Sequence, residues 1–472
     1  MLENKLLDQL SHLDAAGIQR FHDFVFSPFH NKNKRLQQLY TFIEKHYPDF
    51  KTTTFTKKAA YETMYAKEKY DDSKMRAMTS MLSKLLEDFL ALEQFLKDDA
   101  LYDLMLLDAL QQSGMDKYYS QRLKKMYAQQ ELSPHRDIAH HFNHHQLEQR
   151  NYNFAVSKKE PNIGQSLNRL IHNLDTYYIA SRLKFSCELL NRKNILGENI
   201  ELNFLEVIQQ QLKSHPAKDV AIVGIYHQIA QTFLESGKEE HFLQLLQLLE
   251  KHSHEFPASE NKVIYGYAMN YCIKKINTGR NDYLEKVFRL YELLIQHDAI
   301  YEGSFISEWD YKNIVTTALR LNKTEWTENF IHNFKDKLHS DVRTNAFKYN
   351  LANLNYFKGN FGKTMLLLRE VEFTDISYEL SSKSLLLKSY FELNEYEALF
   401  NHAETFKLFL RRNKKVPEYQ KIIYKNLIRY ILKLTKLKTL RQRIPQKLLA
   451  EINESSDIAD KTWLMNKISS ST

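Results

Sequence analysis

The chain has 472 residues, of which 43% are hydrophobic and 26% are charged, so it can bury a large core. Only Cys187 and Cys272 are present, which excludes a disulfide framework and a zinc site built from cysteines. No apolar run approaches the roughly 20 residues that cross a bilayer, and the N-terminus has no signal-peptide pattern. We therefore expect a cytoplasmic protein without a membrane span.

Glycine and proline, the residues that interrupt helices, are scarce. The chain contains 11 Gly and 8 Pro, a composition that favours long uninterrupted amphipathic helices. We predict an all-α fold in three parts: an N-terminal helical bundle (1–98), connecting helices and a loop (99–165), and helical repeats with basic C-terminal helices (166–472).

The N-terminal part predicts five helices, at 2–10, 15–26, 33–46, 57–66 and 73–97. Thr56 can N-cap the fourth helix, and Asp71-Asp72-Ser73 offers caps and favourable negative charge at the start of the fifth. An apolar stripe at helical spacing makes the fifth helix a core helix. The stripe consists of Met75, Met78, Met81, Leu82, Leu85, Leu86, Phe89, Leu92 and Leu96.

The connecting part has fewer regular patterns. We expect a turn at Gly114 and an N-cap at Ser133, where Pro134 would occupy the first helical position. Asn151 to Gly164 lacks clean periodicity, which predicts a long loop or a domain boundary.

In the third part, residues that end helices recur at intervals along the sequence, as expected of stacked helical hairpins. The predicted turns are Ser236-Gly237, Asn277-Thr278-Gly279, Leu321-Asn322, Lys358-Gly359 and Leu393-Asn394. Two units align at an offset of 35 residues, which pairs Gly359 with Asn394 and Phe361 with Tyr396. We expect the aromatic rings of Phe361 and Tyr396 to be buried. This period resembles the tetratricopeptide repeat, and the resemblance implies a solenoid over about 166–437.

The whole chain also resembles a group of bacterial all-helical proteins that brings no activity with it. The resemblance rests on Phe21–Phe24, Ser27-Pro28-Phe29-His30-Asn31-Lys32-Asn33-Lys34, Tyr47-Pro48-Asp49-Phe50, Tyr70-Asp71-Asp72 and Asp460-Lys461-Thr462-Trp463-Leu464.

Three local patterns suggest chemistry, and each has a more ordinary interpretation. The Gly-Lys-Thr at 362–364 follows a predicted helix and has Phe357 where a phosphate loop needs glycine, so we interpret it as a turn. Four histidines at helical spacing offer two imidazole pairs for a metal, but nothing nearby completes a site, and a solvated or interface face is the better interpretation. They are His140, His141, His144 and His145.

The third pattern, at 56–86, has the length of a helix-turn-helix. It would present Lys74, Arg76 and Lys84 to a phosphate backbone. The long apolar stripe favours a core helix instead.

Positive charge is concentrated near the C-terminus. Between Lys407 and Lys447, fourteen basic residues face one acid, Glu418, a local +13 that leaves −5 for the rest of a chain of net charge +8. One helix is expected to carry a basic stripe while Ile423, Leu427, Ile431 and Leu434 face the core. The stripe consists of Lys421, Lys425, Arg429, Lys433 and Lys436.

This basic stripe is the strongest candidate site, for nucleic acid, an acidic protein or an anionic membrane surface, although a solvated face is the simpler interpretation. No catalytic motif is found, so we expect no enzyme, cofactor, bound metal or small-molecule substrate. The predicted function is a scaffold that binds a protein or peptide in the solenoid groove, with a nucleic-acid-associated regulator as the alternative.

Overall fold

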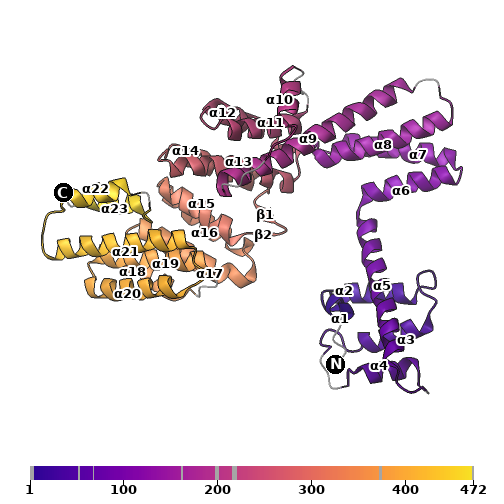
Figure 1. Ribbon diagram of the computed structural model, residues 1–472, viewed down its shortest axis with the longest axis horizontal. Coiled ribbons are helices and arrows are strands. Elements are labelled where there is room, and N and C mark those ends of the chain that lie inside the picture. The colour runs from indigo at the N-terminus through magenta and orange to yellow at the C-terminus, as the bar shows by residue number, and fades with distance from the viewer. Residues whose placement is uncertain are drawn as a thin grey trace. The chain divides into compact units, whose positions relative to one another are not determined.

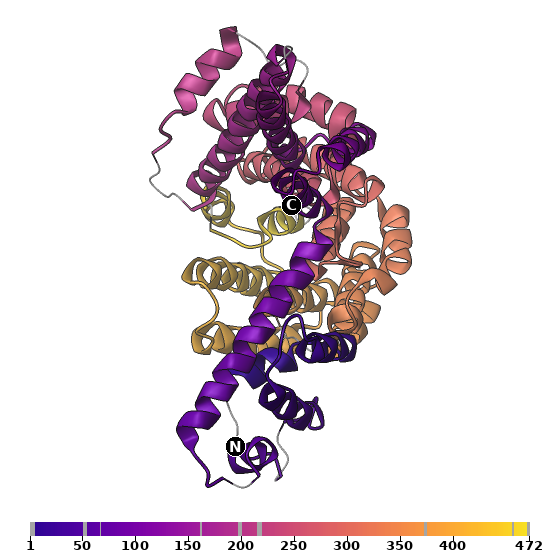
Figure 2. The same ribbon diagram turned by 90° about the vertical axis from the view of Figure 1, so that its right-hand side faces the viewer.

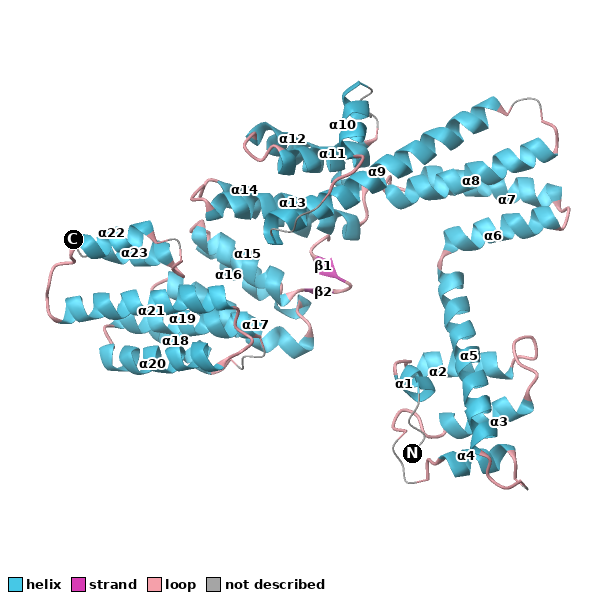
Figure 3. Ribbon diagram, viewed as in Figure 1, coloured by secondary structure: helices cyan, strands magenta, loops and turns pink. Residues whose placement is uncertain are grey.

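The computed structural model describes residues 5–50, 54–66, 68–160, 163–196, 201–214, 220–371, 375–455 and 457–469. These residues form 23 α-helices, two 3-10 helices and one pair of two-residue strands, which confirms the all-α prediction (Figures 1 and 3). The chain divides into two compact units, one of residues 1–133 and 142–174 and the other of residues 134–141 and 175–472. No described helix has both the length and the apolar character of a membrane span.

The first five helices enclose one hydrophobic core. They are α1 (Lys5–Ser11), α2 (Ala15–Phe26), α3 (Lys34–Glu44), α4 (Lys57–Met64) and α5 (Asp72–Lys97). Helix α5 contacts α1, α2 and α3. The predicted caps are confirmed: the side chain of Thr56 accepts a hydrogen bond from the Ala59 amide, and that of Asp71 accepts from Ser73 and Lys74.

The predicted stripe of α5 is correct except at two positions. Met81 is 49% exposed and Leu96 is 55% exposed. Met81 lies about 100° around the helix from the buried Leu82, on the side away from the core. Leu96 lies beyond Phe89, the last buried residue of the helix.

Three further helices of this unit enclose a smaller core: α6 (Asp99–Gln112), α7 (Asp116–Leu132) and α8 (Ile138–Ser157). The beginning of α9 (Gly164–Leu196) also belongs to this unit. The predicted cap at Ser133 is wrong, because Ser133 ends α7 and the side chain of Asp137 accepts the hydrogen bond from the His140 amide. The loop predicted from Asn151 is also wrong over its first half, since α8 continues to Ser157.

A buried ring explains the longer α8. Phe154 is 6% exposed and stacks on Tyr119 with ring centroids 4.1 Å apart. The helix ends at Ser157, and two residues later the positive φ of 53° at Lys159 lets the Glu160 amide donate back to the carbonyl of Ala155.

The second unit contains a row of consecutive hairpins. Its helices are α10 (Leu205–Ser214), α11 (Ala221–Leu234), α12 (Glu239–His252), η1 (Ser253–Glu255), α13 (Ala258–Asn277), α14 (Tyr283–Gln296), α15 (Glu308–Arg320), α16 (Thr324–Asn333), η2 (Lys335–Lys337), α17 (Ser340–Phe357), α18 (Phe361–Arg369), α19 (Ile376–Leu393), α20 (Tyr396–Arg412), α21 (Glu418–Thr439), α22 (Gln446–Glu454) and α23 (Lys461–Ser469). Strands β1 (Tyr301–Glu302) and β2 (Phe305–Ile306) pair antiparallel, with Tyr301 opposite Ile306.

Each of the helices α11, α13, α15, α17 and α19 contacts the helix that follows it. First helices of neighbouring hairpins also meet: α15 contacts α17, α17 contacts α19, and α19 contacts α21. In Figure 2 the colours pass from pink through orange to gold along this row. The side chains of successive first helices therefore lie beside one another.

Four of the predicted turns share one backbone device. Gly279, Asn322, Gly359 and Asn394 have φ values of 95°, 57°, 78° and 58°. After each of them, the next amide donates to the carbonyl five residues earlier, the closure of a Schellman motif. This motif needs a left-handed residue, which glycine and asparagine supply at the lowest cost.

The predicted equivalence of the last two turns is confirmed, but the expected burial of the aromatic residues is not. Phe361 and Tyr396 begin α18 and α20 and are only partly buried, because a first-turn residue packs against the preceding helix from one side. The buried equivalents lie three residues later, at Thr364 and Leu399, both 0% exposed. Thr364 Oγ1 donates to the carbonyl of Ala352, 3.1 Å away, which satisfies its buried hydroxyl.

Candidate functional site

Four first helices contribute side chains to one polar cluster in the second unit. Lys312 on α15 donates from Nζ to Oγ of Ser381 on α19, 2.9 Å away. The phenols of Tyr349 on α17 and Tyr424 on α21 also interact with the Ser381 side chain. Ammonium and hydroxyl groups from α15, α17, α19 and α21 therefore converge on one point.

Aromatic rings surround the ammonium of Lys312. Its Nζ lies 4.7 Å from the ring centroid of Tyr378, 5.4 Å from that of Tyr349 and 5.8 Å from that of Trp309. Tyr378 is itself held by a hydrogen bond from its hydroxyl to the carbonyl of Glu308, 2.7 Å long. The rings attract a cation through their faces while they keep water away from it.

Lys312 has no carboxylate partner in the described part of the chain, since no ion pair within 4.0 Å involves it. Burial lowers the pKa of Lys312 to about 8, against the opposing charges of Asp375 and Glu308 at longer range. The side chain is therefore mainly protonated at neutral pH. A partly buried cation that lacks a paired anion is costly, and such groups are concentrated at functional sites.

The adjoining stretch of α19 shows how this face holds a carboxylate. Asp460, just before α23, accepts a hydrogen bond from Ser384 Oγ at 2.7 Å and pairs with Lys388 Nζ at 3.0 Å. Burial would raise the pKa of Asp460, but the charge of Lys388 and the Ser384 hydrogen bond outweigh it and lower the pKa. One turn farther along α19, Glu392 accepts from the indole of Trp463 at 3.0 Å.

Ser381, Ser384, Lys388 and Glu392 follow one another at helical spacing on one face of α19. Each of the two serines on this face therefore has a lysine neighbour: Lys388 of the same helix for Ser384, and Lys312 of α15 for Ser381. The pair of Ser384 and Lys388 binds a carboxylate of the same chain, whereas the pair of Ser381 and Lys312 contacts rings and hydroxyls.

The predicted basic stripe lies on α21, but its charges are not equally available. Lys421 has only 17% of its side chain exposed and pairs with Glu418 at 3.2 Å. Arg429 and Lys433 share the carboxylate of Glu451 on α22, at 2.8 and 3.4 Å.

The remaining stripe residues, Lys425 and Lys436, are exposed, and no ion pair of the described residues involves them. On the core side of α21, Leu427, Ile431 and Leu434 are buried as predicted, while Ile423 is half-buried. The helix is thus amphipathic as expected, with two of its five stripe cations unshared.

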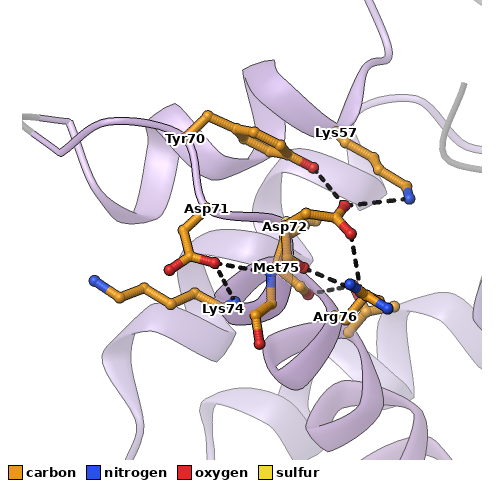
Figure 4. A network of polar contacts seen from close by, with 9 residues as sticks. Lys57, Tyr70, Asp71, Asp72, Lys74, Met75 and Arg76 are labelled. Carbon is orange, nitrogen blue, oxygen red and sulfur yellow. Dashed lines mark hydrogen bonds and ion pairs between the residues drawn. The ribbon is translucent and has the colours of Figure 1, made fainter.

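In the segment 56–86, which was considered as a helix-turn-helix, basic residues form ion pairs with neighbouring acidic residues (Figure 4). Asp72 accepts from the hydroxyl of Tyr70 at 2.8 Å and pairs with Arg76 at 2.9 Å and with Lys57 at 3.6 Å. Lys74 pairs with Glu68 at 2.5 Å. Because α5 is also a core helix, we interpret these cations as stabilising the junction of α4 and α5 rather than as contacts for a phosphate backbone.

The other two patterns also lie in ordinary settings. Gly359 and Asn360 lie in the turn between α17 and α18, whereas Gly362, Lys363 and Thr364 lie in the first turn of α18, where the Thr364 hydroxyl is hydrogen-bonded. The four histidines lie on α8, where His141 is buried and the other three are half-buried, so they do not form a solvated face. Among the described residues no group of three or more His, Cys, Asp or Glu is arranged to hold a metal.

Comparison with family models, curated proteins and solved structures finds no match to this chain. The site must therefore be interpreted from its own geometry.

The sequence did not reveal the cluster around Lys312. Its members are separated by up to about a hundred residues along the chain, and Lys312 and Ser381 alone are 69 residues apart. The available signal was weak. It consisted of Lys312, three residues after Trp309 in the first helix of one predicted hairpin, and Ser381 in the first helix of another.

Proposed function

We propose that the hairpins of residues 166–437 form a tetratricopeptide-like solenoid whose first helices make one continuous wall. The repeated contacts between α15, α17, α19 and α21 and the shared turn motif support this arrangement. A wall of this kind is suited to an extended ligand, because each hairpin adds one helix face to it.

On this wall, the chain acts as a non-enzymatic scaffold that binds a segment of a partner protein. The observation that carries the proposal is the ammonium of Lys312, which is surrounded by hydroxyls and rings and has no ion-paired carboxylate in the part of the chain that the structure describes. The contact of Asp460 with Ser384 and Lys388 supports an acidic side chain as the group that would complete it.

The experiment is an affinity capture from the native cell, with the full chain as bait and mass spectrometry as the readout. Lys312→Met should lose the main partner, because methionine keeps the length of the side chain and removes its charge. Lys425→Met is the matched control, since it makes the same substitution at an exposed position on α21. Equal recovery of the partner by wild type and Lys312→Met would refute the proposal.

A second candidate function is nucleic-acid association through α21, favoured by the exposed and unshared charges of Lys425 and Lys436. Binding through phosphates falls steeply with added salt. A nuclease-treated arm of the same capture separates the two: partners that disappear after nuclease treatment, and with Lys425→Met, belong to this second function.

A further inference from the structure

Helix α9 exposes a row of large apolar residues, while its buried side is polar near its beginning and mainly apolar from Ala180 onward. Ser166, Asn173 and Thr176 are buried, with exposed fractions of 6%, 8% and 6%. On the opposite side, five large apolar residues are exposed by 38% to 64%. They are Leu167, Ile171, Leu174, Tyr178 and Phe185. A soluble helix usually exposes polar residues, so a continuous row of exposed apolar residues gives this face the composition of an interface.

The exposed residues follow the spacing of a coiled coil. The steps from Leu167 to Ile171, Leu174 and Tyr178 are four, three and four residues, and continuing them reaches Ser181 and then Phe185. A seam with alternating steps of three and four fits another α-helix of the same period. The stripe lies on one continuous helix, so the regular helix alone defines its geometry.

The charged residues beside the seam would pair with the same residues of a second, antiparallel copy of α9. Asp175 and Arg182 flank it on the same side, one before and one after its centre. If a second copy of α9 lies antiparallel, with Tyr178 opposite Ser181 and Leu174 opposite Phe185, then Asp175 lies beside Arg182 of the other copy, and the reverse. Arg182 already donates to the carbonyl of Asn203, but a guanidinium has five N–H donors and can serve both groups.

We infer that the exposed face of α9 binds the same face of a second copy of this chain as an antiparallel, two-fold symmetric helix pair. Leu174, Tyr178 and Phe185 form the apolar seam, and two Asp175–Arg182 pairs set its direction. A parallel pair would not bring these unlike charges together, which is why the antiparallel arrangement is preferred.

The test is the molar mass of the full chain in solution, measured by light scattering over a wide range of concentration. The wild type should be dimeric at high concentration and dissociate on dilution. Tyr178→Glu, which places a charge in the centre of the seam, should raise the dissociation constant by about tenfold or more. Leu366→Glu is the matched control on α18, where Leu366 is 60% exposed, and should leave the dimer unchanged.

Charge reversal tests the direction of the pair. Asp175→Arg should weaken the dimer by setting arginine against arginine, and the double variant Asp175→Arg, Arg182→Asp should restore it. Circular dichroism checks that each variant remains helical. A monomeric wild type, a dimer insensitive to Tyr178→Glu, or a double variant as weak as Asp175→Arg alone would each overturn the inference.

Discussion

Lys312 and the lysines of α21 carry the same charge in opposite settings. The α21 cations are numerous, mostly exposed, and partly shared with Glu418 and Glu451. Lys312 is single, mostly surrounded by protein, and forms no ion pair with a carboxylate of the described residues. Many exposed charges are typical of an ordinary solvated surface. Several hydrogen-bond donors that converge around one desolvated charge are a stronger indication of a binding site.

The largest effect concerns the scaffold that brings the donors together. Leu354 is 1% exposed, so Leu354→Ala should lower the free energy of unfolding by about 2–5 kcal/mol. Leu386 on α19 is only partly buried, so its replacement by alanine should cost less. Hydrogen exchange should show loosening of the neighbouring hairpins too; a change confined to α17 and α18 would contradict a stacked row.

The next effect separates a binding residue from a structural one. Lys312→Met should not destabilise the protein and should raise its free energy of unfolding by roughly 1–3 kcal/mol at neutral pH, because it removes a desolvated charge. A loss of stability comparable to Leu354→Ala would show that Lys312 serves the fold instead.

The pH dependence sharpens the same comparison. The pKa of Lys312 is about 8 in the folded chain, against an ordinary value of 10.5. Between these values the unfolded state binds more protons, so the wild type should gain stability relative to Lys312→Met as pH rises from 8 to 10.5. Denaturant titrations of both proteins across that window measure the difference, and a constant difference would contradict the lowered pKa.

Much of the fold follows from local chemistry that a sequence displays. The turns at Gly359 and Asn394 were predictable because a left-handed residue is nearly always glycine or asparagine. The turn at Arg441, with φ of 50°, was not, since arginine rarely takes that conformation and nothing nearby marks it.

The candidate site was harder to predict. The spacing of α21 showed that a basic face exists, but not that Glu451 returns from α22 to share two of its charges. For the same reason the contact of Lys312 with Ser381 was invisible, because it depends on how α15, α17 and α19 pack rather than on any local pattern.

A smaller effect tests the turns. Asn394→Ala should lower the free energy of unfolding by about 1 kcal/mol, because alanine lacks the tolerance of asparagine for a positive φ. Asn394→Gly is the control and should be close to neutral. Thermal unfolding of both variants gives the comparison, and equal losses would mean that the conformation of the turn is not what matters.

The smallest effect on stability is expected on α21. Reversing Lys425, Arg429 and Lys433 to Glu leaves the buried residues of the helix untouched, so denaturant unfolding should stay close to that of the wild type. The variant should lose only salt-sensitive binding to anions. Marked unfolding would show that the shared carboxylate of Glu451 is structurally important.

The most direct measurement compares three full-length proteins for affinity to the main captured partner: the wild type, Lys312→Met and the α21 triple variant. The account predicts that Lys312→Met weakens binding by about tenfold or more, whereas the triple variant keeps wild-type affinity at physiological salt. The reverse outcome, with affinity lost in the triple variant and kept in Lys312→Met, would contradict the central claim and place recognition on the basic stripe.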